Sequence, residues 1–330
     1  MSMYDRFGRE IDYLRISVTD RCGLNCRYCK NEDFRLLDKD ELLTDDELIR
    51  TASVMAGLGI KHIRLTGGEP LDREGITELT GRLVKTKGII SVDMTTNGLK
   101  LAQCASALAA AGLNGVNVSL DTVDESRFRM ICGDREGASD SGYVSRILDG
   151  IDAALEAGLK VKINTVFTRI NRDDWESMVQ LAKERSVDVR FIELMPLGAW
   201  QPADHVPVSW LKEQLITAFP KAQKLDGRRG SGPAVYYRIP GFKGCIGFIS
   251  AVGDKFCDRC NRIRLTAEGG LKPCLCLGDK LDLKGMLRND RSDQELSEAI
   301  KRAIYEKPRE HCFETPELVT EHMSMSAIGG

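Results

Sequence analysis

Apolar and polar residues alternate in six short stretches over the first two thirds of the chain, and runs with helical periodicity separate these stretches. The alternation predicts strands at 12–19, 62–66, 91–95, 115–120, 160–166 and 188–193. Amphipathic runs predict helices at 44–58, 74–86, 101–111, 143–157 and 173–184, several of which begin at the cap residues Thr44, Asn171 or Asp173. Repeated strand–helix units form a parallel sheet, and six units are two short of a complete eight-stranded barrel. We therefore predict an α/β fold, a partial (β/α)6 TIM-like barrel.

The alternation within these strands places their polar residues on one face of the sheet. A parallel strand buried on both faces is nearly continuous in Val, Ile and Leu, whereas Val161–Asn164 and its counterparts alternate. If the helices cover the apolar face, the polar residues converge on the concave interior; they are Arg15, Arg64, Asn117, Ser119, Lys162, Asn164 and Arg190. An ion pair with Asp or Glu would be enough to explain any single cation on this face. Four cations in the same phase predict a polyanionic ligand, and Arg and Lys suit phosphate.

The amino-acid composition of the chain changes after residue 222. Residues 222–245 are rich in Gly, Arg and Pro, and within them Ala234–Arg238 predicts a strand. Such a segment is typical of a linker into a second module. We therefore predict two domains, a barrel over residues 1–222 and a smaller module over residues 223–330.

Composition and charge narrow the class of protein. The chain has 330 residues, of which 42% are hydrophobic and 29% are charged, so a sizeable core is expected and long disorder is not. The net charge of -2 gives no general attraction to nucleic acid or to an anionic membrane. No run of about 18 apolar residues and no signal peptide are found. We therefore expect a cytoplasmic protein whose 11 cysteines bind metal rather than form disulfides.

Three cysteines, Cys22, Cys26 and Cys29, stand within eight positions directly after the first predicted strand. Thiolates favour zinc or iron–sulfur clusters. Structural zinc is normally enclosed by four ligands, and no His or fourth Cys lies nearby in the sequence. Three thiols leave one iron of a four-iron cluster without a protein ligand, and that iron can bind a reactive molecule.

A second group comprises Cys257, Cys260, Cys274 and Cys276. With all four as ligands it is a structural zinc site; with the first three alone it is a second iron–sulfur cluster with an open iron. In an extended segment, the side chains of Cys274 and Cys276 would leave on opposite faces, which disfavours joint ligation. The scattered cysteines are expected to be small buried or semi-buried apolar residues; they are Cys104, Cys132, Cys245 and Cys312.

The first cysteine motif, CxxxCxxC with Tyr28 just before its last Cys, resembles that of the radical S-adenosylmethionine (SAM) superfamily. Thr66–Pro70, Thr95–Gly98 and Asn117–Asp121, at the ends of predicted strands, resemble ligand-contact segments of the same superfamily. The resemblance implies that three thiolates hold a 4Fe-4S cluster and that SAM chelates the fourth iron. An electron then cleaves SAM to a 5′-deoxyadenosyl radical.

Three more segments extend the resemblance over nearly the whole chain. RFIELMPLG at 190–198, FCDRCNRIRLTAEGGLKPCL at 256–275 and the final pair Gly329–Gly330 resemble the GTP 3′,8-cyclase family of molybdenum cofactor biosynthesis. This implies a lyase whose partial barrel is of the radical SAM type, with a smaller C-terminal module closing the open side of the barrel. It also implies conversion of GTP to 3′,8-cyclo-7,8-dihydro-GTP, with the 5′-deoxyadenosyl radical abstracting the ribose 3′ hydrogen.

The resemblance also implies a role for each matched residue. The thiols of Cys22, Cys26 and Cys29 hold the SAM-cleaving cluster, and those of Cys257, Cys260 and Cys274 hold a second 4Fe-4S cluster. SAM contacts fall on Tyr28, Gly68, Ser119 and Met195, and GTP contacts on Arg15, Arg64, Thr95, Lys162, Arg262, Ile263, Arg264 and Arg190. Gly329 and Gly330 belong to a tail that reaches the active site, although terminal glycines are more commonly disordered. Residues 132–141 are expected to form a surface loop with no evident chemistry.

The implied partners are SAM, GTP, an external electron donor and cyclic pyranopterin monophosphate synthase, which takes the product. We expect a monomer or homodimer that binds neither nucleic acid nor membrane. A peptide-modifying radical SAM enzyme is the nearest alternative, but such enzymes generally have more C-terminal cysteines. A simple iron–sulfur electron carrier would use four cysteines per cluster, and the balanced charge argues against a zinc-stabilised nucleic-acid binder.

Overall fold

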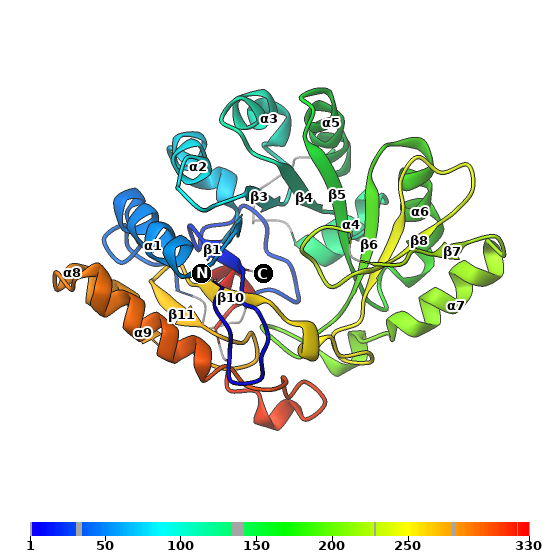
Figure 1. Ribbon diagram of the computed structural model, residues 1–330. Helices are drawn as coiled ribbons and strands as arrows, with labels where there is room; N and C mark the ends of the chain where they lie inside the picture. Colours follow the sequence, from blue (N-terminus) through cyan, green and yellow to red (C-terminus); the bar gives the residue numbers. More distant parts are fainter. Residues whose placement is uncertain are drawn as a thin grey trace.

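The computed structural model describes residues 2–30, 35–133, 142–227, 229–278, 281–321 and 323–329. Its centre is a curved sheet with helices on the outer side (Figure 1). Six strands pair in parallel in chain order: β1 (Tyr13–Ser17), β2 (His62–Thr66), β3 (Ser91–Thr96), β4 (Gly115–Ser119), β5 (Lys160–Phe167) and β6 (Asp188–Glu193). The helices between them include α1 (Asp45–Leu58), α2 (Ile76–Val84), α3 (Leu101–Ala110), α5 (Tyr143–Glu156) and α6 (Trp175–Glu184). The partial barrel is therefore confirmed, and the predicted ends of these elements are correct to within two residues.

The apolar positions of the strands form the core between sheet and helices. Ile16, Ile63, Met94, Val118 and Ile163 are completely buried. Burying each such side chain contributes roughly 1.5–3 kcal/mol to folding. Because successive residues of a strand point to opposite faces, this burial turns the intervening polar residues towards the concave side.

Thr44 is confirmed as a helix cap, whereas neither Asn171 nor Asp173 caps α6. The Thr44 hydroxyl accepts a hydrogen bond from the Glu47 amide and forms a complete capping box for α1, as predicted. Asn171 caps no helix with its side chain, because its Oδ1 accepts from the Thr168 amide and its Nδ2 donates to the Asp121 carbonyl. The chain instead forms a 3₁₀ turn at Arg172–Asp174, so α6 begins at Trp175 rather than at Asp173.

One barrel helix was not predicted. α4 (Glu125–Cys132) begins at Asp124, whose side chain accepts a hydrogen bond from the Arg127 amide. Four of its eight residues are charged or polar, so its apolar periodicity is weak.

The C-terminal segment extends both edges of the sheet. β9 (Ile246–Ile249) pairs in parallel with β6, and β10 (Arg262–Leu265) pairs in parallel with β1. β8 (Val235–Arg238) and β7 (Gln223–Lys224) continue beyond β9, whereas β11 (Gly270–Lys272) and β12 (Leu281–Asp282) continue beyond β10. Since this segment and the barrel strands share one sheet, the boundary at residue 222 stays a prediction.

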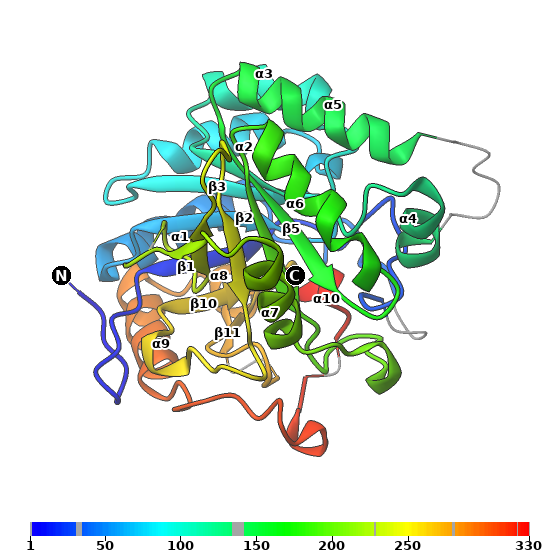
Figure 2. The same ribbon diagram turned by 90° about the vertical axis from the view of Figure 1, so that its right-hand side faces the viewer.

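The remaining helices connect the C-terminal segment to the barrel. They are α7 (Val208–Ala218), α8 (Leu283–Arg288), α9 (Asp293–Tyr305) and α10 (Met325–Ile328). Ion pairs between Arg288 and Glu47 and between Arg50 and Asp293 join α8 and α9 to α1. Figure 2 shows α10, in red, within the body of the molecule rather than at its rim.

Candidate functional site

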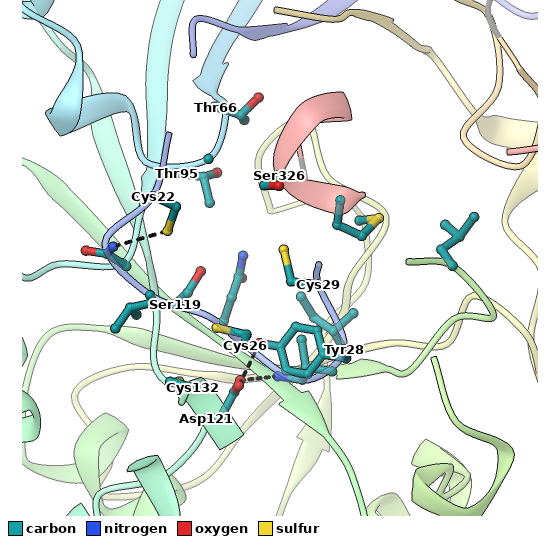
Figure 3. A pocket seen from close by; sticks show the side chains of 18 of the residues that line it. Cys22, Cys26, Tyr28, Cys29, Thr66, Thr95, Ser119, Asp121, Cys132 and Ser326 are labelled. Carbon is teal, nitrogen blue, oxygen red and sulfur yellow. Dashed lines mark hydrogen bonds between the residues drawn. The ribbon is translucent and has the colours of Figure 1, made fainter. Parts of the chain in front are cut away.

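The carboxyl ends of the barrel strands surround a cavity of about 210 Å³, which we call the thiol cavity (Figure 3). Ligands bind at this end of the strands in folds of this class. Eight of the residues predicted to hold the cluster or to contact SAM or GTP line it: Cys22, Cys26, Tyr28, Cys29, Gly68, Thr95, Ser119 and Met195. The loops after β1, β2 and β6 and the end of β4 thus bring the predicted SAM-contact residues to the three thiols.

The loop after β1 is fixed by α4, the helix that was not predicted. The amides of Asn25 and Arg27 donate to the carbonyls of Cys132 and Ile131, at 2.8 and 2.9 Å. These bonds tie the middle of the cysteine motif to the last turn of α4. They therefore fix the backbone from which the thiols reach the cavity.

The three thiols form no disulfide and have raised pKa values. Burial raises the pKa of Cys22 to about 11, although the Leu24 amide donates to its sulfur. A hydrogen bond with the Cys132 thiol, together with burial, raises the pKa of Cys26 well above its usual value. Burial and the neighbouring thiols raise the pKa of Cys29 as well. A positive charge bound among these thiols would favour their thiolate forms, and bound iron would supply such a charge.

Two glycines let the loop after β2 lie directly against the cysteine loop. Gly67 has a φ of +148°, and a Cβ there would overlap the Thr19 carbonyl oxygen. A Cβ on Gly68 would overlap the Arg21 carbonyl oxygen. Because neither glycine has a Cβ, the two loops approach closely enough to form backbone hydrogen bonds. The Gly68 amide donates to the Thr19 carbonyl at 2.7 Å, and the Glu69 amide donates to the Arg21 carbonyl at 2.6 Å.

Glu69 joins this turn to the end of β3. Its carboxylate accepts from the Thr96 hydroxyl at 2.7 Å, the Asn97 amide at 2.6 Å and the Leu71 amide at 3.0 Å. Burial raises the pKa of Glu69 to about 7 despite these bonds. The Asn97 side chain lies 3.9 Å from the sulfur of Cys22, so the network extends to the first thiol.

A tyrosine–carboxylate pair forms part of the wall of the thiol cavity (Figure 3). The Tyr28 hydroxyl donates to Asp121 at 2.7 Å, and the Val166 amide donates to the other carboxylate oxygen at 2.7 Å. Burial raises the pKa of Asp121 to about 6. Sequence analysis identified Tyr28 but gave Asp121 no role, although Asp121 ends a segment that it quoted.

A second cavity, of about 260 Å³, lies further down the barrel, and we call it the cation cavity. Six cationic side chains and one carboxylate, that of Asp93, are among the described residues that line it. The cations are Arg15, Arg64, Lys160, Lys162, Arg190 and Arg262. Four of them are the cations that the alternation places on the concave face. The excess of positive charge suits an anionic ligand.

Lys162 is held at the side of the cation cavity by neutral and acidic partners. Its ammonium donates to the Arg229 carbonyl at 3.0 Å and to the Tyr236 hydroxyl at 3.2 Å, and it lies 3.9 Å from Asp188. Burial and then the charge of Arg190 lower the pKa of Lys162 to about 8. An anion in the cavity would stabilise the charged form of Lys162.

Arg190 is the least satisfied cation of this cavity. It is buried, and its Nε and Nη2 have no hydrogen-bond acceptor among the described residues. Burial lowers the pKa of its guanidinium. Arg64, in contrast, lies 3.5 Å from Asp93. Buried guanidinium groups without acceptors are costly, so these donors point to a ligand that accepts from them.

Three of the predicted GTP contacts lie outside the cation cavity. Thr95 lines the thiol cavity, where its hydroxyl has no partner among the described residues. The Ile263 side chain is completely buried in the core and lines neither cavity. Arg264 donates to the Gly329 carbonyl at 2.5 Å.

The second group of cysteines lies around the start of β10 and the end of β11. Although burial opposes it, the charges of Lys307 and Arg262 lower the pKa of the Cys260 thiol. Burial raises the pKa of Cys257, the neighbouring Cys260 and Cys274 thiols contribute to this rise, and the Cys274 thiol also opposes the lowering of the pKa of Cys260. Among the described residues, no three His, Cys, Asp or Glu side chains converge closely enough to bind a single metal ion.

The prediction that Cys274 and Cys276 point to opposite faces is wrong. β11 ends at Lys272, and the chain turns after Pro273 instead of remaining extended. The two sulfurs consequently lie 3.5 Å apart. The Cys276 side chain is buried beside Phe313, and a hydrogen bond with the Cys274 thiol raises its pKa.

The C-terminal tail enters the space between the two cavities. The Met325 amide donates to the Cys29 carbonyl at 2.9 Å, and Ser326 lines the thiol cavity. The Gly329 carbonyl accepts from Arg264 and, at 3.3 Å, from Arg15. Gly330, the other predicted tail residue, lies outside the described residues.

The stretch 132–141 was expected to be a surface loop without chemistry. Residues 134–141 lie outside the described residues. Cys132 itself is wrongly included in that expectation, because it ends α4, is buried and lines the thiol cavity beside Cys26. Its spacing from the motif in the sequence gave no sign of this proximity.

Residues 16–182 match the radical SAM superfamily, and residues 187–313 match the family described as Molybdenum Cofactor Synthesis C. A GTP 3′,8-cyclase of Clostridium perfringens (strain 13 / Type A) is 44% identical over 334 residues, which cover 99% of this chain and 100% of that protein. The chain belongs to the GTP 3′,8-cyclase family. Another member of the family, from Pelotomaculum thermopropionicum, is 42% identical over 335 residues, with the same coverage of both chains.

Solved structures share the fold of this GTP 3′,8-cyclase family member. Streptococcus suis SuiB bound to S-adenosylmethionine superimposes with a TM-score of 0.63 at 14% identity, over 96% of this chain and 77% of SuiB. The same protein bound to the precursor peptide SuiA gives a TM-score of 0.61 at 16% identity, over 91% of this chain and 65% of SuiB. At these identities the likeness shows the fold alone. Within the described part of the chain, no helix has the length and apolar character needed to cross a membrane.

Proposed function

We infer that this family member is a radical SAM cyclase that converts GTP to 3′,8-cyclo-7,8-dihydro-GTP, the first step of molybdenum cofactor biosynthesis. One observation supports this most strongly: a cavity lined by three thiols adjoins a cavity lined by six cations, inside the barrel of a chain 44% identical to a GTP 3′,8-cyclase.

The residues of the thiol cavity fit a 4Fe-4S cluster with bound SAM. Cys22, Cys26 and Cys29 provide three soft ligands and leave one iron open. When bound, the cluster supplies the electron that cleaves SAM to a 5′-deoxyadenosyl radical. We propose that Tyr28, Gly68, Ser119 and Met195 contact SAM, because all four line the same cavity.

The cation cavity fits the triphosphate of GTP. Phosphate oxygens would accept the buried Nε–H and Nη2–H of Arg190, which have no protein acceptor among the described residues. They would also keep the Lys162 ammonium charged. We propose Arg15, Arg64, Arg262 and Arg264 as further contacts to GTP, with Thr95 reaching it from the thiol cavity.

The residues around the cavities contribute placement and exclusion of water. A carbon radical is quenched by solvent or by mobile side chains, so its path must be short and dry. The hydrogen bond between Tyr28 and Asp121 fixes one part of the wall, and the Glu69 network fixes another. The tail residue Ser326 closes the cavity beside Cys29. Holding the two reacting carbons of GTP at close range further increases the rate of cyclisation.

We further propose a second 4Fe-4S cluster on Cys257, Cys260 and Cys274. The donor set supports it, since the three thiols influence one another electrostatically and the charges of Lys307 and Arg262 favour the thiolate form of Cys260. An open iron of this cluster would bind the guanine base and leave the ribose directed into the barrel.

The cellular setting belongs to the same proposal. We propose an external electron donor for the SAM-cleaving cluster and transfer of the cyclised product to cyclic pyranopterin monophosphate synthase. We also propose that the enzyme acts in the cytoplasm as a monomer or homodimer, without nucleic-acid or membrane partners.

The test is an anaerobic incubation of the iron-reconstituted protein with SAM, a strong reductant and GTP, followed by mass spectrometry. We expect 5′-deoxyadenosine together with a cyclised guanosine triphosphate. Deoxyadenosine with unchanged GTP would rule out the substrate. Iron and sulfide analysis tests the second cluster separately: a variant with Cys22, Cys26 and Cys29 replaced by Ala should retain about four irons.

A further inference from the structure

β5 runs from the cation cavity to the thiol cavity. Its alternate residues Lys162, Asn164 and Val166 face the concave side of the sheet. Lys162 lines the cation cavity, Val166 lines the thiol cavity, and Asn164 is the one described residue that lines both. Since a parallel strand rises about 3.3 Å per residue, the level of Asn164 is about 6.6 Å from each of the other two.

The neighbours of Asn164 across the sheet belong to different cavities. In the strand register, Asn164 pairs with Ser119 on β4 and with Arg190 on β6. Ser119 lines the thiol cavity, whereas Arg190 lines the cation cavity. Asn164 therefore lies at the junction of the two cavities, both in its position along β5 and in the residues with which it pairs on β4 and β6.

The carboxamide of Asn164 lacks the partner that other structural asparagines have. Its Oδ1 is buried and accepts no hydrogen bond within the described part of the chain. Asn171 and Asn114, in contrast, use Oδ1 to accept from the backbone amides of Thr168 and Val92. A buried acceptor left without a donor is destabilising, so its retention in a cavity points to a ligand that donates to it.

We propose that Asn164 holds the ribose of GTP at the junction of the two cavities, with Oδ1 accepting a hydrogen bond from a secondary hydroxyl. This inference rests on the proposed function, because it places the triphosphate at the level of Lys162 and SAM at the level of Val166. The ribose, which joins the triphosphate to the base, then passes Asn164. The hydrogen bond turns the 3′ carbon and its hydrogen towards the thiol cavity, so Asn164 is a positioning residue for the abstraction step.

The first measurement is the dissociation constant of GTP and of its 2′-deoxy and 3′-deoxy analogues, by anaerobic equilibrium dialysis. One neutral hydrogen bond corresponds to a change of about 3- to 10-fold. We expect Asn164→Ala to weaken GTP binding by this factor. One of the two deoxy analogues should bind the wild type and Asn164→Ala equally, because the donor is already missing.

Two variants distinguish this bond from a general loss of structure. Asn164→Asp keeps an acceptor at the same place, so it should retain the preference for GTP over that deoxy analogue. Asn117→Ala is a matched control: Asn117 lines the cation cavity but not the thiol cavity, so its replacement should affect all three nucleotides by the same factor. Midpoints of thermal unfolding establish that the variants are folded.

The second measurement is the ratio of 5′-deoxyadenosine to cyclised nucleotide, together with deuterium transfer from 3′-deuterated GTP. A misplaced ribose should raise that ratio several-fold in Asn164→Ala and lower the deuterium content of deoxyadenosine. The proposal would be overturned if Asn164→Ala weakened the binding of both deoxy analogues by the same factor as that of GTP, and if the ratio of 5′-deoxyadenosine to cyclised nucleotide stayed unchanged. A wild type that binds no GTP would instead overturn the proposed substrate, so the two failures are distinguishable.

Discussion

Replacing Gly329 by Ala should release the C-terminal tail from the barrel. Gly329 has a φ of +74°, which only glycine adopts without strain. A Cβ there would overlap the Thr66 hydroxyl oxygen and lie 3.3 Å from Ser17 Cβ. The Thr66 hydroxyl cannot simply rotate away, because it donates to the Ile16 carbonyl at 3.1 Å. The tail must therefore move, and the contacts of Gly329 are lost.

The expected size of this effect comes from two contributions. A non-glycine residue at such a φ costs about 1 kcal/mol. Moving the carbonyl of Gly329 removes its charge-assisted hydrogen bond from Arg264, 2.5 Å long, which contributes about 2 kcal/mol. Together these correspond to about 3 kcal/mol, or roughly a 100-fold shift towards the released tail. The longer bond from Arg15, 3.3 Å, adds little.

Hydrogen exchange measures this release directly. In the seated tail, the Met325 amide donates to the Cys29 carbonyl and should exchange slowly. In Gly329→Ala it should exchange about 100-fold faster, as mass spectrometry of the C-terminal peptide would show. Gly158→Ala is the matched control, since Gly158 has a φ of +79° and an added Cβ would meet nothing within 4 Å. Equal tail protection in Gly329→Ala and the wild type would refute the reasoning.

Three further outcomes are expected. Cys22→Ala should lower the iron content by about four per chain, whereas Cys104→Ala, which lines neither cavity, should leave it unchanged by colorimetric iron analysis. Lys162→Met should weaken GTP binding by about 10- to 100-fold and guanosine binding little, because charged hydrogen bonds to phosphate contribute about 1.5–3 kcal/mol. In the metal-free protein, the pKa of Glu69, raised to about 7 from 4.5, means that the unfolded chain loses this proton at lower pH than the folded one. Between about pH 4.5 and 7 the wild type should therefore lose about 3 kcal/mol of stability relative to Glu69→Gln, as urea unfolding at pH 5 and 8 would measure.

Local patterns in the sequence were sufficient to predict the barrel and the direction of its polar residues. In β5, burial of Val161, Ile163 and Thr165 turns Lys162 and Asn164 to the concave side. That inference needs only the period of a strand and the position of the helices. The identity of the ligand did not follow from the alternation, because a cation pairs equally well with Asp or phosphate.

Contacts between distant segments could not be predicted in this way. β10 pairs with β1 across about 250 residues, and neither strand alone specifies its partner. Cys132 meets Cys26 only because α4 folds back on the cysteine loop. Cys276 turns towards Cys274 because the chain bends after β11 instead of continuing as a strand. In each case a tertiary contact, rather than a local preference, decides where the sulfur lies.

The seating of the tail against Cys29 also sets an order of events during synthesis. Met325 leaves the ribosome about 300 residues after Cys29, which at 5–20 residues per second is about 15–60 seconds later. Throughout that interval the nascent chain has its first three thiols but lacks the segment that covers them. Cluster assembly machinery has its freest access during this window, and so do oxidants. In a chain that acquires its iron while still on the ribosome, the segment around Met325 would cover the cluster afterwards.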